Sequence, residues 1–364
     1  MPDGMARGIG RRAGVAAAAV AGTVLVGALL GKTSMRGLRA VPSPSSTLPT
    51  FVAQPQPSPV WPIDESAGIS LFVATRSELS HIDLDTQARS VAMISISPVG
   101  GIARVGTLLV LLESLGDHTE ASVQPFDLRA PRVGLGQADA LVPSTREGRV
   151  WLISQGSRTE GREVELGSSR VVRRAALPAL FSPVADTAAG LVATRSTDGG
   201  TELWIWDTRS RRLGRRLGEG GLLGVIGAKP HVVAWTPGCS QGSCPLHLTE
   251  PATGKDVGVE PVRGTFSYLG GGAFSPDGAR LAAFAPVSNQ RAALVIVDVA
   301  SRTARRISGS EVATGEPIGA AGWSSDGRWL FFSGLGGWMR VWRVGWDGAQ
   351  LLPGIPASYS FSAS

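Results

Sequence analysis

The sequence of 364 residues predicts an all-β fold, a seven-bladed β-propeller preceded by one N-terminal transmembrane helix and a Pro-rich linker. Three observations predict this arrangement. A 19-residue segment without charge lies near the N-terminus, a charge-free stretch rich in Pro follows it, and short apolar runs recur regularly over residues 66–364. Four short strands in a repeat of roughly 40 to 50 residues are typical of one propeller blade.

The composition is that of a turn-rich globular protein. The chain has 48 Gly and 24 Pro, but 43% of its residues are hydrophobic, which is too large a share for a disordered chain. Its net charge of +6 comes almost entirely from Arg, because only Lys32, Lys229 and Lys255 are lysines. Such a preference for Arg, with abundant Ala and Gly, is typical of a high-GC bacterial genome. The charge is therefore weak evidence about partners, and we expect no nucleic-acid binding.

The N-terminal region is predicted to anchor the chain in a membrane. Residues 1–12 form a short basic tail, and residues 13–31 would span roughly 28 Å as a helix, which is enough to cross the hydrocarbon core. We expect an uncleaved signal anchor; a cleaved signal peptide and a buried core helix are the alternatives. Basic residues flank both ends equally, so the positive-inside rule does not decide the orientation. A short tail before a large domain favours a single-pass protein of the cell membrane, with its propeller outside the cytoplasm.

Residues 32–65 are expected to form a linker rich in Pro and Ser. The stretch Val41–Pro62 carries seven prolines and no charged residue. Such a composition favours an extended, semi-rigid spacer, which would hold the following domain away from the bilayer.

The propeller region, residues 66–364, is defined by two repeating markers. Apolar runs begin at Leu71, Leu108, Val150, Leu191, Val232, Leu281 and Leu330, at spacings of 37 to 49 residues. The strand that follows each run ends near an acid: Asp83, Asp127, Glu165, Asp207, Glu250, Asp298 and Asp347. Two independent markers with the same count predict seven blades. The regular position of the acids predicts that they hydrogen-bond within turns.

The best-preserved turn is in the segment AFSPDGARLAAF, residues 273–284, with an echo in GWSSDGRWLFF, residues 322–332. Pro276 presets φ, Asp277 can bond its own backbone, and Gly278 tolerates a positive φ at the turn exit. Each segment is therefore predicted to be a hairpin.

The two ends of the propeller are expected to meet. The first repeat lacks an inner strand before Leu71, and the chain ends with the strand-like segment ASYSFSAS, residues 357–364. We predict that this tail supplies the missing strand, which removes an exposed sheet edge.

The segment FSPDGARLAAF, residues 274–284, resembles the repeat of Tol-type periplasmic β-propellers. The pairs Trp206-Asp207 and Trp346-Asp347 resemble the end of a blade in WD-repeat proteins. The resemblance covers about 300 residues and is specific in two or three repeats. It implies a non-catalytic platform that binds other proteins, and it carries over no site residues because the shared motif is structural.

The two cysteines, Cys239 and Cys244, lie between two strand-like runs. Outside the cytoplasm such a pair is expected to form a disulfide. The closed loop is short, so its stabilisation should be on the order of 2 kcal/mol or less. Ser240 completes a formal G-x-S-x-G, but a strand follows where a nucleophile elbow needs a helix. The four histidines have no metal-like spacing, and we expect no catalytic residue, metal or cofactor.

The last repeat is rich in Trp and offers a candidate binding surface. Alternation along a strand places Trp338, Arg340 and Trp342 on one face. Most Trp residues of this repeat are expected to pack between neighbouring blades, but Trp338 follows a stretch rich in Gly and could anchor a partner if it lies on a loop.

These features favour a membrane-anchored, extracytoplasmic, non-catalytic scaffold whose partner is an unknown protein or a cell-envelope polymer. One alternative is a propeller that binds carbohydrate or cell-wall polymer. Another, less favoured, is a polysaccharide-acting or lactonase-like enzyme, which would need acids or histidines to converge in the central channel.

Overall fold

The computed structural model describes residues 62–63, 68–75, 77–93, 101–126, 128, 130–198, 200–226, 232–237, 246–259, 272–288, 290–313, 321–334, 338–356 and 360–363. The predicted tail and anchor, and nearly all of the predicted linker, lie outside these ranges. Within them, no helix is both long and apolar enough to cross a bilayer.

The described residues form seven antiparallel sheets of four strands each, here called blades 1 to 7. Strands are given from the innermost outward. Blade 1 contains β28 (Ser360–Ala363), β1 (Ser70–Ala74), β2 (Glu78–Asp83) and β3 (Arg89–Met93). Blade 2 contains β4 (Ile102–Val105), β5 (Leu108–Leu115), β6 (His118–Pro125) and β7 (Val133–Gln137). Blade 3 contains β8 (Ala140–Pro143), β9 (Arg149–Gln155), β10 (Thr159–Glu165) and β11 (Arg170–Leu177).

The remaining blades repeat this pattern. Blade 4 contains β12 (Phe181–Thr187), β13 (Gly190–Thr197), β14 (Gly200–Asp207) and β15 (Arg212–Glu219). Blade 5 contains β16 (Gly221–Ile226), β17 (Val232–Thr236), β18 (Leu246–Thr249) and β19 (Asp256–Val259). Blade 6 contains β20 (Ala273–Phe274), β21 (Arg280–Ser288), β22 (Arg291–Asp298) and β23 (Thr303–Ala313). Blade 7 contains β24 (Gly322–Trp323), β25 (Trp329–Ser333), β26 (Trp338–Arg343) and β27 (Gln350–Pro356).

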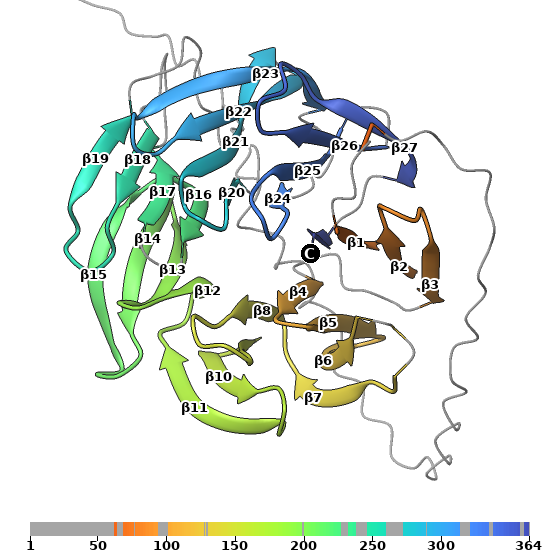
Figure 1. Ribbon diagram of the computed structural model, residues 1–364. Coiled ribbons are helices and arrows are strands. Elements are labelled where there is room, and N and C mark those ends of the chain that lie inside the picture. The colour runs from red at the N-terminus through yellow and green to blue at the C-terminus, as the bar shows by residue number, and fades with distance from the viewer. Residues whose placement is uncertain are drawn as a thin grey trace, which may run out of the picture.

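The blades stand around a central axis, which confirms the seven-bladed propeller that the sequence predicts (Figure 1). The last strand of the chain, β28, pairs antiparallel with β1, and Val73 lies opposite Phe361. The C-terminal segment is therefore the innermost strand of the first blade, at the place that the sequence predicts. A single sheet thus joins the two ends of the ring, and its inner edge is not left open.

The repeating apolar runs are the second strands of the blades, and each is buried on both faces. In β1, Leu71 and Val73 pack against blade 7, whereas Phe72 and Ala74 pack against blade 2. Seven apolar clusters of this kind fill the spaces between neighbouring blades. Because alternate side chains enter two different clusters, both sets must be apolar. This two-sided burial produces the continuous runs seen in the sequence.

The turn at Ser275–Gly278 has the predicted geometry. The N–H of Gly278 donates to the carbonyl of Ser275 at 2.8 Å, and Gly278 has a φ of 69°. Gly327 occupies the same position in blade 7 with a φ of 68°. A side chain would be strained at either glycine, so the Asp-Gly pair is a requirement of the turn.

The ring has two faces, distinguished by their loops. On the turn face, the first strand of a blade joins the second and the third joins the fourth, as at Ser275–Gly278. On the connection face, the second strand joins the third and each blade joins the next, as at residues 178–180. The chain enters the ring on the turn face, because it starts the second strand of blade 1 at Ser70.

Candidate functional site

The acids at the ends of the third strands are held inside turns, as the sequence predicts. The N–H and hydroxyl of Ser301 both donate to Oδ1 of Asp298 at 2.8 Å. The hydroxyl of Thr253 donates to Glu250 at 2.6 Å. The bond from the Ser301 N–H, then that from its hydroxyl, lowers the pKa of Asp298. The same turn contacts recur at Asp83, Glu165 and Asp207. These carboxylates therefore accept hydrogen bonds within their own turns and stabilise them.

These turns share a second feature, a residue with left-handed backbone four positions after the acid. The φ values are 59° at Gln87, 52° at Ser169, 54° at Arg211, 70° at Gly254 and 59° at Arg302. Only glycine adopts this conformation without cost. Blades 4 and 6 therefore hold an arginine where blade 5 has a glycine.

A buried polar cluster joins blades 3 and 4. Glu163 is fully buried, and its Oε2 lies 2.9 Å from Nη2 of Arg173. The hydroxyl of Ser144 lies 2.8 Å from Glu163 and 3.1 Å from Asp186. Ser144 can donate to only one of the two acids at a time. The sequence does not reveal this cluster. Glu163 and Glu165 are two positions apart in the same strand, and nothing in the sequence indicates which of the two is buried. With Glu163 inaccessible and paired to Arg173, the cluster holds the blades together.

The predicted binding surface of Trp338, Arg340 and Trp342 needs a correction. Trp342 is only 1% exposed, packs edge-on against Trp323 and donates from its indole Nε1 to the carbonyl of Trp346 at 3.0 Å. Arg340 donates to the carbonyl of Gly309 in blade 6 at 2.8 Å. The three residues share one side of β26, but blade 6 covers most of that side. Trp338 alone remains exposed, at the end of β26 on the connection face.

Cys239, Cys244 and Ser240 lie outside the described residues. Within the described part of the chain, no group of three His, Cys, Asp or Glu side chains is placed to hold a metal ion. His81 stacks on Phe72 and His247 stacks on Trp235, with ring centroids 4.6 and 4.4 Å apart. Each of these two histidines packs across strands inside its own blade.

The connection face carries exposed apolar residues. Leu180, in the loop between blades 3 and 4, is 75% exposed and has a φ of 73°. Leu115, Val287 and Trp338 are also exposed on this face. A leucine with left-handed backbone is uncommon, and exposure of its side chain to water adds a second cost.

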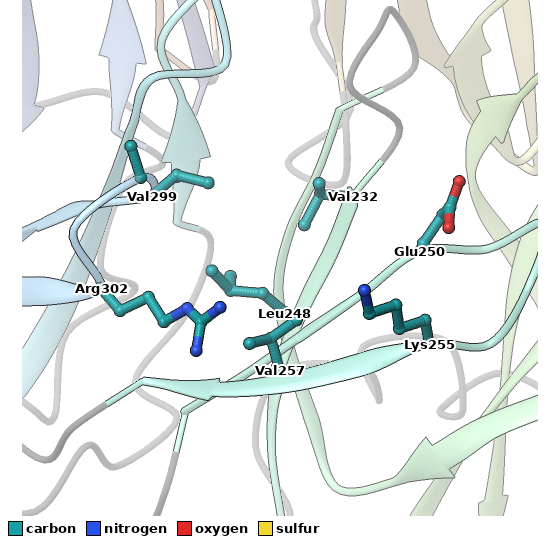
Figure 2. A pocket seen from close by; sticks show the side chains of 8 residues that line it. Val232, Leu248, Glu250, Lys255, Val257, Val299 and Arg302 are labelled. Carbon is teal, nitrogen blue, oxygen red and sulfur yellow. The ribbon is translucent and has the colours of Figure 1, made fainter.

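The turn face carries a groove of about 220 Å³ between blades 5 and 6. Its floor is apolar, and Lys255 and Arg302 reach it from opposite sides (Figure 2). The apolar lining comes from β17, β18, β19 and the turn after β22, namely Val232, Leu248, Val257, Val299 and Ala300. Sequence reasoning missed this groove, because its residues come from two repeats and each looks like an ordinary strand or turn position.

Comparisons with known proteins support the fold and leave the activity open. No protein-family model matches the chain, and no curated protein matches it. The β-propeller domain of the Trilobed protease from Pyrococcus furiosus is similar, with a TM-score of 0.56 and 10% identity over 79% of this chain and 92% of that one. A chain of a mitotic checkpoint complex is also similar, with a TM-score of 0.53 and 13% identity over 88% of this chain and 99% of that one. TolB from Acinetobacter baumannii has a TM-score of 0.48 and 11% identity over 81% of this chain and 82% of that one.

At these identities the likeness to the first two propellers shows the fold alone. One of the similar propellers belongs to a protease and another to a multiprotein complex, so the shared architecture does not separate an enzyme from a binding protein.

Proposed function

We propose that this chain is a non-catalytic scaffold that binds another protein through the connection face of its propeller. The observation that carries the proposal is Leu180, which combines 75% exposure with a left-handed backbone. Strained positions cluster where function requires them, and exposed apolar side chains that gather on one face mark surfaces that a partner can cover. The first strand in chain order, β1, begins at Ser70 on the opposite face.

The turn acids also favour a binding role over a catalytic one. Asp298 and Glu250 are occupied by hydrogen bonds from their own turns. A polysaccharide-acting or lactonase-like enzyme would need acids that are free to meet a substrate.

Photocrosslinking in cells that produce the full chain tests the scaffold proposal. A photoreactive amino acid at position 180 should give one discrete protein adduct. The control position is Val133, which is 51% exposed but lies on the turn face of blade 2, and it should give none. The absence of an adduct at 180, or the same adducts from both positions, would overturn the proposal.

A carbohydrate-binding or cell-wall-polymer-binding role is the second candidate, and exposed Trp338 favours it. An indole that is 43% exposed could stack on a sugar ring. Binding on a glycan array that is lost in Trp338→Ala would support this role, and no binding by the unmodified chain would exclude it.

The proposed location is the cell membrane, with residues 13–31 as an uncleaved anchor and the propeller outside the cytoplasm. The support is the charge-free segment itself. The full chain should stay in the membrane after an alkaline carbonate wash and keep an N-terminal epitope. Val24→Arg, which costs about 2.5 to 3.5 kcal/mol at a helix centre, should reduce insertion. Recovery of a soluble protein without the epitope would instead indicate a cleaved signal peptide.

A further inference from the structure

The groove between blades 5 and 6 is separate from the proposed contact face and has a chemistry of its own. Its floor consists of aliphatic side chains, with Leu248 and Val257 at its centre (Figure 2). The guanidinium group of Arg302 and the ammonium group of Lys255 approach this floor from opposite sides. Neither cation forms an ion pair with any residue that the structure describes.

The acids near the groove do not neutralise these cations. Glu250 lines the groove, but its carboxylate accepts from Thr253 at 2.6 Å and points away from the floor (Figure 2). Asp298 precedes the lining residues of blade 6, and its carboxylate is bound by Ser301.

A third cation lies beside the turn that carries Lys255, although it does not line the groove. Arg215 of β15 lies against Gly254, where an added Cβ would come 2.4 Å from its Nη1. Gly254 immediately precedes Lys255. The turn between β18 and β19 therefore has the charge of Lys255 on the groove side and that of Arg215 next to Gly254.

The left-handed backbone at Arg302 belongs to the turn, because Gln87, Ser169 and Arg211 adopt it at the equivalent positions of other blades. What sets Arg302 apart is its place in the fold, since it is the arginine of this set that lines the groove.

From these contacts we propose that the groove binds the C-terminal residue of a partner polypeptide, with its aliphatic side chain on the floor and its free carboxylate between Lys255 and Arg302. A C-terminal aliphatic residue carries its carboxylate and its alkyl group on the same carbon, which matches cations placed directly over an apolar floor. Arg binds carboxylates through two parallel hydrogen bonds, and Lys adds a point charge.

The size of the groove agrees with this occupant. A volume of about 220 Å³ is below the roughly 300 to 1,000 Å³ typical of small-molecule pockets, so it suits a single residue better than a cofactor. A phosphate group fits less well, because it is more strongly hydrated and would lose that water over the side chains of Leu248 and Val257.

The test measures fluorescence anisotropy with the full chain in detergent and a labelled peptide Gly-Ser-Gly-Ala-Leu with a free C-terminal carboxylate. The peptide should bind saturably, and its C-terminal amide should bind at least about tenfold more weakly, because the amide cannot form charge-assisted hydrogen bonds with the two cations. Equal binding of the amide would overturn the proposal. Competition by octanoate as strong as by the unlabelled peptide would point to a fatty acid and overturn the peptide assignment.

The matched variants are Arg302→Gly and Arg211→Gly. Both replace an arginine with left-handed backbone by the residue that this backbone prefers, so both proteins should fold at least as well as the original. Only Arg302 lines the groove. Arg302→Gly should weaken peptide binding about tenfold or more, and Arg211→Gly should change it less than threefold. Equal effects of the two variants, or unchanged binding in Arg302→Gly, would overturn the proposal.

Lys255→Met provides a second check. It keeps a long side chain beside the floor and removes the charge, so the apolar contact is retained. Peptide binding should fall about fivefold or more and become less dependent on salt. Binding that is unchanged in Lys255→Met would contradict the assigned role of this residue.

Discussion

The hydroxyl of Ser275 lies 2.5 Å from the carboxylate of Asp277, and Ser324 repeats this contact with Asp326 at 2.5 Å in the next blade. Ser275 also accepts the backbone N–H of Arg280 at 2.9 Å, and it is 2% exposed. One buried hydroxyl therefore joins the start of the hairpin to its end. The repeated turn is defined by this serine as much as by the Asp-Gly pair.

Ser275→Ala should destabilise the protein by about 1 to 3 kcal/mol at pH 7, because it leaves the partly buried N–H of Arg280 without its partner. The Ser275 hydroxyl, then the N–H of Ala279, holds the pKa of Asp277 below its usual value. A carboxyl with a lowered folded-state pKa contributes stability above its unfolded pKa of about 4 and loses it as the pH falls through the folded value.

Urea unfolding at several pH values checks this prediction. The difference between Ser275→Ala and the unmodified chain should be largest at pH 7 and smaller below about pH 3. A difference that stays constant over this range would show that Asp277 does not contribute through its charge.

Arg173→Met should destabilise the propeller by about 3 to 5 kcal/mol, because it leaves the carboxylate of Glu163 buried without a counter-charge. The matched control is Arg174→Met. Arg174 is the next residue in β11 but is exposed, and its replacement should change stability by no more than about 0.5 kcal/mol. Denaturant unfolding measures both variants, and equal effects would contradict the assigned role of the buried pair.

Trp342→Ala should cost about 3 to 5 kcal/mol, because it opens a cavity between blades 6 and 7. Trp338→Ala removes a similar side chain from the surface and should cost much less. Thermal unfolding of the two variants separates a core residue from a contact residue. A small effect of Trp342→Ala would place that side chain outside the core.

Removal of residues 357–364 should open the ring at blade 1. The deletion takes away β28 and leaves β1 with an unpaired edge that could pair with another chain. We expect a lower thermal midpoint and concentration-dependent association in size-exclusion chromatography. Supplying the peptide ASYSFSAS should partly restore the monomer, and a truncated chain as stable as the full one would show that closure does not require this strand.

Most of the fold could be predicted because its signals are local. The continuous run at Leu71–Ala74 reflects burial on two sides, and the geometry at Gly278 follows from three neighbouring residues. The exposed end of β26 was also partly visible, since Trp338 follows a stretch rich in Gly. Trp342 was misplaced because strand alternation tells which side chains share a face but not what covers that face.

The groove could not be predicted either, because the sequence does not tell which side chains of neighbouring blades meet. Leu248 and Lys255 belong to blade 5 and Arg302 to blade 6, and nothing in either repeat indicates that the three side chains meet. Glu163 is a second example, since its burial depends on Asp186 and Ser144 from other strands.

Local sequence patterns are enough to predict the number of blades, the turn chemistry and the part played by the C-terminal strand. These features depend on the order of neighbouring residues and on a sequence repeat that occurs once in each blade. Packing between blades places Trp342 in the core, leaves Leu180 exposed, and puts Lys255 and Arg302, which form no ion pair with the described residues, on either side of one apolar groove. Those properties arise where neighbouring blades meet, and packing between distant segments sets which side chains lose contact with water.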